Sequence, residues 1–512
     1  MRPPPVATND LLCGVPCPAS QGGYRSDRAL ATSAQGLLGS LAVTDVAALC
    51  LAAMTLGQGC TVECRGPGCE GAYPDGRVDL LGDLPLDGQE VLIDDVARGA
   101  IVGSVVSGSA FSTAAFPGGL VVGQPEARSV RQFSLPEGAV ADEGAEVLWA
   151  SNDDDFGHAI AILPAPDGSS WSMVVAAPGA DRDRGVLHIY ADASGGTVEP
   201  SLSLQGASQG DRLGERLRLC PDRTGDGLPE LLVSAPWMQD VPELDAFDPA
   251  GDRPAVEPLA GAVMLIDSDD LLATTVGDTR SILEVATVWW GEDAGHSLGV
   301  GLDCHTDLDG DGLFDLVLGA PQFNESAGKI YLVLSGQGFL GGPIGARVRP
   351  TLEGGPAEML GESVATFERP DEGGQLLVGA PGHDGGRGAA IWLDASDLTG
   401  VGLQTRTRIN NDKTTTDHVG RTVAVAELDG DGLPDLLVGG PDRRVGQLYD
   451  VGQIGVFLGS RALGDTEQLG DADLSITDDQ GFRRVGRHIV SHDVDDDGID
   501  ELLLPTRSPR SR

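Results

Sequence analysis

Acidic side chains at alternate positions are the residues of this chain best suited to chemistry. The clearest run reads Asp307-Leu308-Asp309-Gly310-Asp311-Gly312-Leu313-Phe314-Asp315 and leads directly into an apolar stretch. Carboxylate oxygens of this kind, with a backbone carbonyl at Leu313 and a glycine that permits a sharp turn, suit a hard cation such as Ca²⁺. The run predicts a calcium loop that leads into a β-strand, without the helices and late bidentate Glu of an EF-hand. The predicted ligands are Asp307, Asp309, Asp311, Leu313 and Asp315.

Three further runs repeat this spacing with substitutions. One begins with Glu, and two end in Glu, of which one also has Thr at its third position with Arg223 beside it. Their predicted ligands are Glu427, Asp429, Asp431, Leu433 and Asp435; Asp493, Asp495, Asp497, Ile499 and Glu501; and Asp222, Thr224, Asp226, Leu228 and Glu230. We therefore expect three to four Ca²⁺ sites. The alternative is an ordinary turn with solvated acids, in which the clustered carboxylates would repel one another. Mg²⁺ fits less well because it prefers strict octahedral geometry and retains its waters.

The acidic runs sit inside a longer repeat with a period of about 60 residues. Each unit has an apolar residue followed by Gly, then an apolar strand that closes on small residues and usually Pro, then a strand led by Gly. One unit shows all three parts in Leu298-Gly299, Val317 to Pro321 and Gly328 to Val333, and a later unit places its leading glycine at Gly455. Short strands repeated at this period favour a β-propeller over a sandwich, which does not repeat in this way, and over a β-helix, whose repeats are shorter.

The units resemble FG-GAP repeats, which build the head propeller of integrin alpha chains. The resemblance rests on Phe156-Gly157 with Ala176-Ala177-Pro178, and on Leu298-Gly299 with Gly319-Ala320-Pro321. It covers roughly residues 36–505 and implies an all-β propeller of four-stranded antiparallel blades. Seven blades are expected, or eight if the weak N-terminal copy joins the ring. It also implies Ca²⁺ at the acidic loops, but neither an inserted ligand-binding domain nor an Arg-Gly-Asp specificity.

Three regions follow from this pattern. Residues 1–90 form an irregular, cysteine-containing region with a weak or partial repeat, residues 91–505 form the propeller, and residues 506–512 form an Arg/Ser tail. The last unit ends at Pro505 without a Gly-led strand, so we expect an N-terminal strand to complete its sheet. No signal peptide is visible, which suggests a misassigned start or a fragment of a larger surface polypeptide.

The charge balance excludes one class of partner. Lys and Arg number 34 against 78 Asp and Glu, which gives a net charge of −44. A nucleic-acid partner is not expected, because phosphate binding needs the opposite sign. Divalent cations and a solvated acidic surface both fit this composition. The uncharged stretch at residues 99–125 is broken by Gly, Ser, Thr and Pro, so no transmembrane segment is expected.

The eight cysteines of the chain are relevant to the cellular compartment in which it folds. Six crowd the N-terminal region, whereas Cys220 and Cys304 each stand just before an acidic run. Disulfides in an oxidising compartment, free buried thiols and a loosely spaced metal cluster at Cys60, Cys64 and Cys69 all remain open. The spacing does not decide whether Cys220 and Cys304 meet.

No catalytic constellation stands out, and the chain is not expected to be an enzyme. A Gly-x-Ser-x-Gly elbow, a phosphate loop and a His-Glu-x-x-His motif are all missing from the sequence. We expect a calcium-binding scaffold for adhesion or ligand binding at the cell surface or outside the cell, with an unknown protein or glycan ligand. The insertion at residues 237–257 and the pair Trp289-Trp290 are candidate contacts. The alternative is a polysaccharide-binding lectin or a hydrolase-associated propeller whose catalytic domain is absent here.

Overall fold

The computed structural model describes most of the chain from residue 112 onward and three short strands before it. The described residues are 77–79, 90–91, 101–106, 112–116, 119–134, 146–164, 170–193, 199–238, 260–272, 277–292, 295–337, 339–347, 351–370, 372–395, 398, 403–444, 446–477, 484–493 and 498–505. The six N-terminal cysteines and the Arg/Ser tail lie outside them.

The described residues form seven sheets, numbered here in chain order and given from their innermost strand outward. Sheet 1 contains β4 (Ser112–Phe116), β5 (Gly119–Gln124), β6 (Ser129–Ser134) and β7 (Glu146–Ala150). Sheet 2 contains β8 (Ile160–Pro164), β9 (Trp171–Ala177), β10 (Val186–Tyr190), β11 (Leu202–Gln205) and β15 (Asp278–Ser281). Sheet 3 contains β12 (Leu217–Cys220), β13 (Glu230–Ala235), β14 (Ala262–Ile266), β16 (Ala286–Trp290) and β20 (Gly342–Pro343).

The remaining sheets continue this order. Sheet 4 contains β17 (Gly301–Asp303), β18 (Leu316–Ala320), β19 (Lys329–Val333) and β21 (Thr351–Glu353). Sheet 5 contains β22 (Val364–Arg369), β23 (Gly373–Ala380), β24 (Ala389–Asp394), β25 (Gln404–Asn410) and β29 (Thr466–Gln468). Sheet 6 contains β26 (Thr422–Ala426), β27 (Asp435–Gly440), β28 (Gln453–Phe457), β30 (Leu474–Thr477) and β1 (Arg77–Asp79). Sheet 7 contains β31 (Val490–His492), β32 (Glu501–Pro505), β3 (Ile101–Val106) and β2 (Glu90–Val91).

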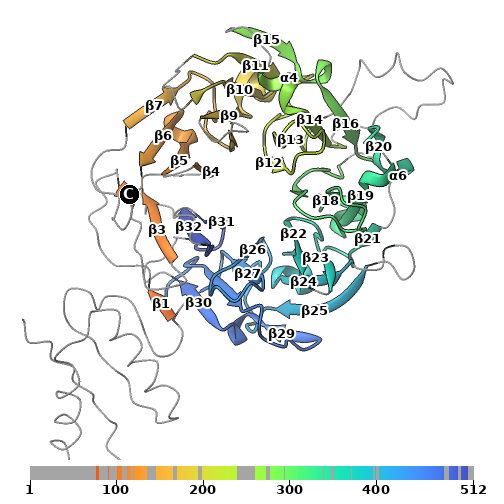
Figure 1. Cartoon of the computed structure of the whole chain (residues 1–512). Helices are drawn as coiled ribbons and strands as arrows, with labels where there is room; N and C mark the ends of the chain where they lie inside the picture. Colours follow the sequence, from red (N-terminus) through yellow and green to blue (C-terminus); the bar gives the residue numbers. More distant parts are fainter. Residues whose placement is uncertain are drawn as a thin grey trace, which may run out of the picture.

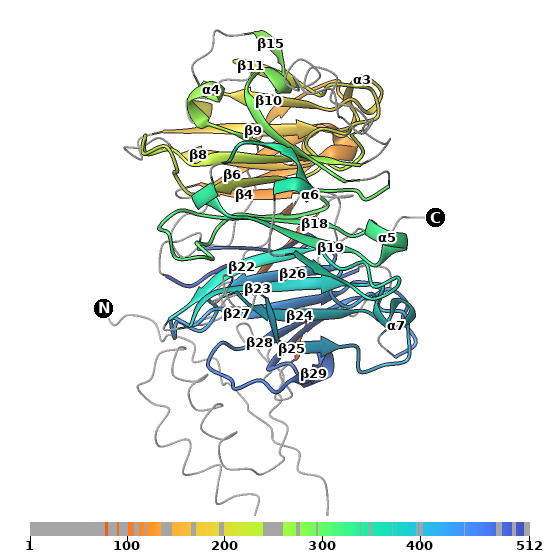
Figure 2. The same ribbon diagram turned by 90° about the vertical axis from the view of Figure 1, so that its right-hand side faces the viewer.

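Helical segments are short and lie in the connections. They are α3 (Ala180–Asp183), α4 (Ser268–Leu272), α5 (Phe323–Ser326), α6 (Ile344–Arg347) and α7 (His383–Gly386), with the 3₁₀ turns η2 (Pro125–Ala127), η5 (Ile282–Glu284), η6 (Ser335–Gln337) and η7 (Leu469–Asp471). The sheets stand around a common centre (Figure 1), and seen from the side their strands run across the thickness of the ring (Figure 2). The innermost strands β4, β8, β12, β17, β22, β26 and β31 contact one another in this order. This all-β arrangement is consistent with the predicted β-propeller.

Sheet 7 joins the two ends of the described chain. Its strands β31 and β32 come from the C-terminal end, and β3 pairs with β32 through Ile101 and Leu502. β2 then adds antiparallel to β3. An N-terminal strand therefore completes the last sheet, as the missing Gly-led strand after Pro505 predicted. The pairing of β3 with β32 is parallel, which the sequence pattern did not indicate.

Four sheets depart from the expected four antiparallel strands, because each carries a fifth strand paired in parallel at its outer edge. These fifth strands are β15, β20, β29 and β1. β15, β20 and β29 come from the connection between the third and fourth strands of the next sheet along the chain. Each therefore ties one sheet to its neighbour at the rim. No sequence pattern marks them, since they are only two to four residues long and mostly polar.

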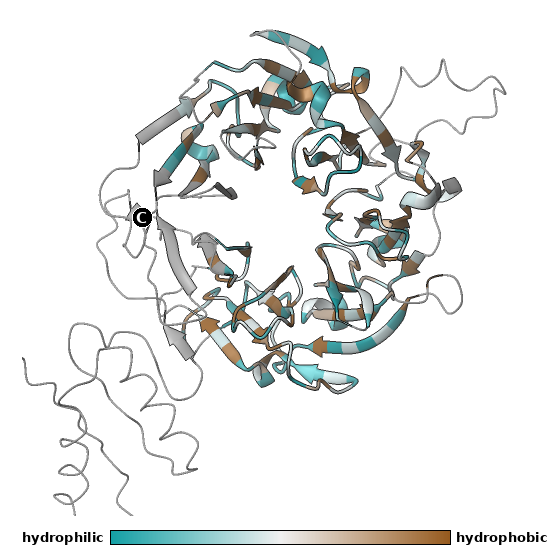
Figure 3. Cartoon of the chain, viewed as in Figure 1, coloured by the Kyte–Doolittle hydropathy of each residue, from teal (hydrophilic) through white to brown (hydrophobic). Residues whose placement is uncertain are grey.

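The core lies between neighbouring sheets rather than inside any one of them. Every residue of β9 is buried, and its side chains alternate between two clusters. Met173 and Val175 pack toward sheet 1, whereas Val174 and Ala176 join residues of sheet 3. This is the two-residue period expected for a strand that is covered on both faces. Apolar residues are accordingly spread around the ring (Figure 3).

The glycine of each apolar–Gly pair makes a backbone hydrogen bond within its own sheet. Its N–H donates to a carbonyl of the second strand at 2.9–3.0 Å, and this bond recurs in five units. The pairs are Gly157 to Ala176, Gly214 to Ser234, Gly299 to Gly319, Gly361 to Gly379, and Gly420 to Gly439. All five donors have positive φ angles, between 81° and 94°, which glycine adopts without the steric cost that other residues meet.

The same glycines touch the preceding sheet through their carbonyl groups. A Cβ added at Gly379 would lie 1.9 Å from the carbonyl oxygen of Gly420, and one at Gly319 would lie 2.0 Å from that of Gly361. A side chain at Gly379 or Gly319 would overlap this carbonyl group. The second strand therefore needs small residues where the next sheet comes close. A second bridge joins each Gly-led strand to the following unit, for example from Leu360 N–H to Ala327 carbonyl at 3.1 Å.

One predicted strand start was wrong. The leading glycine of β28 is Gly452, which has a φ of 85° and bridges to Val485 of the next unit. Gly455 instead lies inside the strand. Three apolar residues follow Gly455 and give it the pattern of a strand start, whereas the start is defined by the backbone bridge from Gly452 to the next unit.

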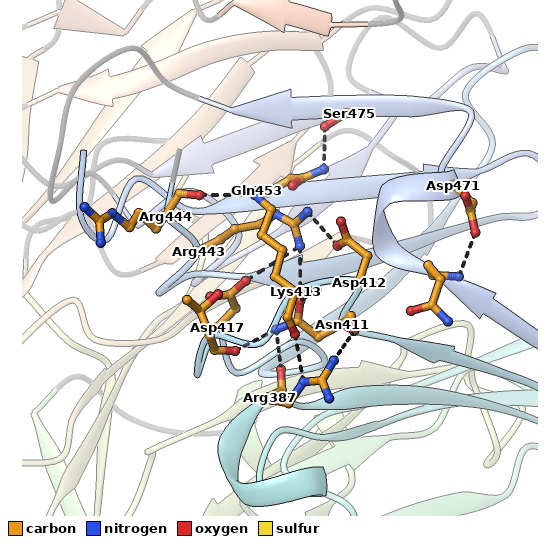
Figure 4. A network of polar contacts seen from close by, with 12 residues as sticks. Arg387, Asn411, Asp412, Lys413, Asp417, Arg443, Arg444, Gln453, Asp471 and Ser475 are labelled. Carbon is orange, nitrogen blue, oxygen red and sulfur yellow. Dashed lines mark hydrogen bonds and ion pairs between the residues drawn. The ribbon is translucent and has the colours of Figure 1, made fainter. Parts of the chain in front are cut away.

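A buried polar network adds to the contact between sheets 5 and 6 (Figure 4). Arg443, with a side chain only 4% exposed, bonds Asp412 at 2.6 Å and lies 3.7 Å from the fully buried Asp417. Asn411 donates to the carbonyl of Arg387 at 3.1 Å, which holds the connection after β25 in place. Removing one partner from such a buried ion pair leaves an uncompensated charge, which is strongly destabilising.

The glycine contacts give a direct stability prediction. Gly379→Ala should lower the unfolding free energy by about 1–3 kcal/mol, because its Cβ overlaps the backbone of Gly420. Gly464→Ala is the matched control, since the atoms nearest its added Cβ lie 3.6 Å away or more. Urea unfolding of both variants measures the difference. Equal stability of the two variants would show that the sheets do not meet as closely as described.

Candidate metal centres

The first acidic loop connects β17 to β18, at the end of an innermost strand. Asp307 organises it by accepting backbone N–H groups on both carboxylate oxygens. Gly310 donates to Oδ1 and Gly312 to Oδ2, each at 2.7 Å. Gly310 and Gly312 have φ angles of 79° and 90°, so the turn needs glycine at both positions. The alternating residues of the sequence thus fold into a tight turn around one carboxylate.

The last acid of this loop is held below the turn. Asp315 is fully buried and accepts Leu308 N–H and Ser335 N–H, both at 2.8 Å. Ser335 follows β19, and its hydroxyl also donates to Asp311 at 2.9 Å. The loop is therefore fixed from two sides of the same sheet, by its own backbone and by the connection after the third strand.

Three carboxylates of the loop converge. Asp307, Asp309 and Asp315 each place an oxygen within 4.8 Å of the other two. Burial, together with the negative charges of Asp309 and Asp307, raises the pKa of Asp315 to about 6. Desolvation and the neighbouring Asp311 and Asp307 also raise the pKa of Asp309. These shifts report an electrostatic conflict that a bound dication would relieve.

The second loop, between β26 and β27, repeats this geometry with Glu at its first position. Glu427 Oε1 accepts Gly430 N–H at 2.7 Å, and Asp435 accepts Leu428 N–H at 2.9 Å and Gly459 N–H at 2.7 Å. Glu427, Asp429 and Asp435 form the second group of three acids within 4.8 Å. Burial, together with the negative charges of Asp429 and Glu427, raises the pKa of Asp435 to about 6. The longer Glu side chain thus reaches the place that Asp307 occupies in the first loop.

The third loop lies between β31 and β32 and is described only in part. Asp493 Oδ2 accepts Gly498 N–H at 2.8 Å, which is the bond that Asp307 makes to Gly312. Predicted ligands Asp495 and Asp497 lie outside the described residues, as does the side chain of Glu501. Asp500 contacts the second loop, where it accepts Glu427 N–H at 2.9 Å and donates its own N–H to Glu427 at 2.7 Å.

The fourth loop, between β12 and β13, keeps the turn without the acid cluster. Asp222 accepts Gly225 and Gly227 N–H groups, each at 2.7 Å. Glu230 accepts the N–H groups of Arg223 and Thr224 at 2.9 and 3.1 Å, and the guanidinium of Arg223 bonds Asp267 at 3.1 Å. Within the described ranges, no group of three acids forms here. Thr224 supplies no charge, so this loop is the weakest candidate of the four.

A disulfide between Cys220 and Cys304 joins the ends of β12 and β17, with Cα atoms 5.3 Å apart. Each cysteine directly precedes an acidic loop, so the bond holds two loops of neighbouring sheets together. The sequence left this pairing open.

The sequence reasoning missed the residues that support the buried aspartates. Ser335 and Gly459 each donate a backbone N–H to the last acid of a loop, and each stands two residues after the end of the third strand. The signal existed in the repeat, because both positions follow a leucine after the Gly-led strand. These two residues support the acid through their backbone N–H groups, which every residue type except Pro supplies, so residue type alone does not mark them.

The candidate ligand-contact residues fall into two groups. Most of the insertion at residues 237–257 lies outside the described residues. Trp289 is 1% exposed and stacks edge-on against Phe339, which makes it a core residue. Among the described residues, no helix combines the length and hydropathy needed to span a bilayer.

The two loops with three converging acids fit Ca²⁺. Their donors are carboxylate oxygens on a rigid hairpin, and no Lys or Arg bonds Asp307, Asp309 or Asp315 within the described part of the chain. Comparison with known families gives a matching result. A family model described as the FG-GAP repeat matches residues 304–333 and 419–457, and FG-GAP repeats occur in integrin alpha-like β-propellers. Each matched segment contains one of the two loops.

The raised pKa values predict how stability depends on pH. In metal-free protein, Asp315 and Asp435 bind more protons in the folded state than in the unfolded state between about pH 4 and pH 6. Their contribution to stability therefore falls as the pH rises through this window and is constant above about pH 7. An Asp315→Asn/Asp435→Asn double variant should lack this component.

Urea unfolding of both proteins from pH 4 to pH 7.5, in metal-free buffer, measures the effect. The free energy of wild type minus that of the variant should decrease with rising pH. A constant or increasing difference would contradict the burial of these carboxylates.

Proposed function

We propose that this chain, which contains FG-GAP repeats, is a calcium-stabilised, seven-bladed β-propeller that serves as an adhesion or ligand-binding scaffold outside the cell or at its surface. The observation that carries the proposal is the convergence of three carboxylates in each of two loops, at Asp307, Asp309 and Asp315 and at Glu427, Asp429 and Asp435. Both loops lie inside the segments that match the FG-GAP repeat.

Calcium would act on the connection between the first and second strands of a blade. The loop carboxylates lie close together and partly out of water, so without a cation they repel one another and resist ionisation. A Ca²⁺ ion held by Asp307, Asp309, Asp311 and Asp315, with the Leu313 carbonyl, would remove that repulsion. The Glu427 loop offers the same set, the Asp493 loop adds a third candidate, and the Asp222 loop is a fourth with weaker support.

A scaffold role is supported by the structural partners that the acidic residues and histidines of the repeat have. The acidic residues of the loops and the histidines beside the glycines have structural partners, for example His418 with Asp442 at 2.7 Å and His383 with Glu358 at 2.7 Å. These contacts lie in the connections between strands and give no arrangement of nucleophile and base among the described residues. We therefore assign no catalytic role and propose a protein or glycan ligand.

An extracellular location is supported by the disulfide. Cys220 and Cys304 are bonded, and such bonds persist in oxidising compartments and are rare in the cytosol. The calcium loops agree with this, because extracellular calcium is abundant enough to fill sites of millimolar affinity.

Calcium binding is tested by isothermal titration of metal-free protein. We expect at least two Ca²⁺ ions per chain, and a stabilisation of about 2.7 kcal/mol per site at a calcium concentration one hundred times its Kd. Asp309→Asn and Asp429→Asn should each remove one binding equivalent, since these exposed acids are one ligand of each cluster.

Glu126→Gln is the matched control, because Glu126 is an equally exposed acid in η2 of sheet 1, which carries none of the four acidic loops. It should bind calcium as wild type does. The proposal fails if wild-type protein binds no calcium, or if all three variants lose the same amount.

The scaffold role is tested separately with the immobilised chain. We expect it to retain a defined glycan from an array, or a single extracellular protein, in calcium and to release it when calcium is chelated. Turnover of a polysaccharide or ester substrate by the purified chain would instead favour an enzyme and contradict the assignment.

A further inference from the structure

Basic side chains gather around the centre of the ring although the protein as a whole is strongly acidic. They follow the glycines of the apolar–Gly pairs, in the sequences Gly214-Glu215-Arg216, Gly420-Arg421 and Gly486-Arg487. Those glycines occupy equivalent places at the start of innermost strands, which bound the centre of the ring (Figure 1). Arg216, Arg421 and Arg487 therefore lie within three residues before an innermost strand, and Arg218 lies inside β12. We call Arg216, Arg218, Arg421 and Arg487 the axial arginine cluster.

Two members of the cluster lack a carboxylate partner. Arg216 precedes β12, and Arg218 lies within it. Neither has an Asp or Glu oxygen within 4.0 Å among the described residues. Arg218 is exposed and Arg216 partly exposed, so solvent reaches both although they stand on an innermost strand. Their charges are available to a ligand that approaches along the axis.

The other two members come from sheets across the ring. Arg421 precedes β26 and Arg487 precedes β31, and the hydroxyl of Thr422 donates to the Arg487 carbonyl at 2.6 Å, which ties the two strand starts together. Sheet 6 stands three places along the ring from sheet 3. The cluster is therefore drawn from opposite sides of the axis rather than from one edge of one sheet.

The positive charges act on one another across this space. Desolvation and repulsion from Arg218 and Arg421 lower the pKa of Arg216, whereas the carboxylates of Glu362 and Glu215 act in the opposite direction. Desolvation together with Arg216, Arg487 and Arg421 lowers the pKa of His488 to about 3. His488 is therefore neutral at physiological pH and serves as a hydrogen-bonding group rather than as a further charge.

The acids near these arginines already have partners. Glu215 lies 3.2 Å from Arg212 and 3.5 Å from His158, and Glu362 lies 3.2 Å from Arg421. Asp303, near Arg218, bonds His305 at 2.6 Å and accepts the N–H and hydroxyl of Thr366. These carboxylates reduce the positive charge at the axis, but none of them pairs with Arg216 or Arg218.

We propose that the axial arginine cluster binds a compact oxyanion, that is, a sulfate, phosphate or carboxylate group, with Arg216 and Arg218 as its main contacts. Guanidinium groups present paired N–H donors that match the two oxygens of such a group. A positive cluster between low-dielectric walls also concentrates anions against the repulsion of a net charge of −44. The site is distinct from the calcium loops, which follow the opposite ends of the innermost strands.

The test is titration of calcium-saturated protein with sodium sulfate, sodium phosphate and sodium acetate at constant ionic strength. We expect saturable binding of at least one of them to wild type. Arg216→Gln and Arg218→Gln should each weaken it by about tenfold, which corresponds to about 1.4 kcal/mol. Arg182→Gln is the matched control, because Arg182 is an exposed arginine outside the cluster, and it should bind as wild type does.

A second arm distinguishes a free oxyanion from one carried by a polymer. A sulfated oligosaccharide that binds at least tenfold more tightly than inorganic sulfate, with the same loss in Arg216→Gln, identifies the glycan as the source. Equal affinities identify the free ion.

Absence of saturable anion binding by wild type overturns the proposal, and this result does not depend on any variant folding. Equal losses in Arg216→Gln and Arg182→Gln overturn it as well. Because calcium is saturating throughout, either outcome leaves the calcium assignment intact.

Discussion

The close approach of backbone to backbone between successive sheets is the constraint on which the rest of this structure depends. The glycine of each apolar–Gly pair bonds its own second strand and touches the small residue of the preceding one, as Gly420 does with Gly439 and Gly379. A side chain at either place would push the sheets apart. Since no sheet buries both of its faces alone, this contact allows the apolar clusters between sheets to form. The apolar–Gly pair and the small residues of the second strand are thus the two partners of one contact between neighbouring sheets.

The candidate sites follow from that contact. Once the innermost strands are fixed, the turn after each of them is held at a set position, and the sequence places acids there. Buried Asp315 and Asp435 are anchored by backbone N–H groups and yet resist ionisation. The scaffold therefore maintains an arrangement that is electrostatically unfavourable by itself, which is a common property of functional sites. The starts of β12, β26 and β31 carry the axial arginines and their other ends lead into acidic loops, so the two ends of these three strands differ in charge.

Much of the fold was predictable from the sequence because each sheet needs the same residues at the same places to pack against its neighbours. Period, strand type, the acidic loops and the completion of the last sheet by an N-terminal strand were all read from the sequence. Pairings between residues far apart in the chain were not predictable, because their separation in the sequence does not give their distance in space. The disulfide between Cys220 and Cys304 is one such pairing. Backbone donors such as Ser335 were also missed, because any residue type supplies an N–H. The polar outer strands were not predicted for a related reason, because they are defined by main-chain pairing and not by a pattern of side chains.

The most direct measurement is a crystal structure of the chain grown in calcium, with anomalous difference density calculated at long wavelength. The account predicts a peak among Asp307, Asp309 and Asp315 and another among Glu427, Asp429 and Asp435, with oxygens about 2.3–2.6 Å from each ion. Flat density at both places, with the turns closed only by their backbone hydrogen bonds, would contradict it.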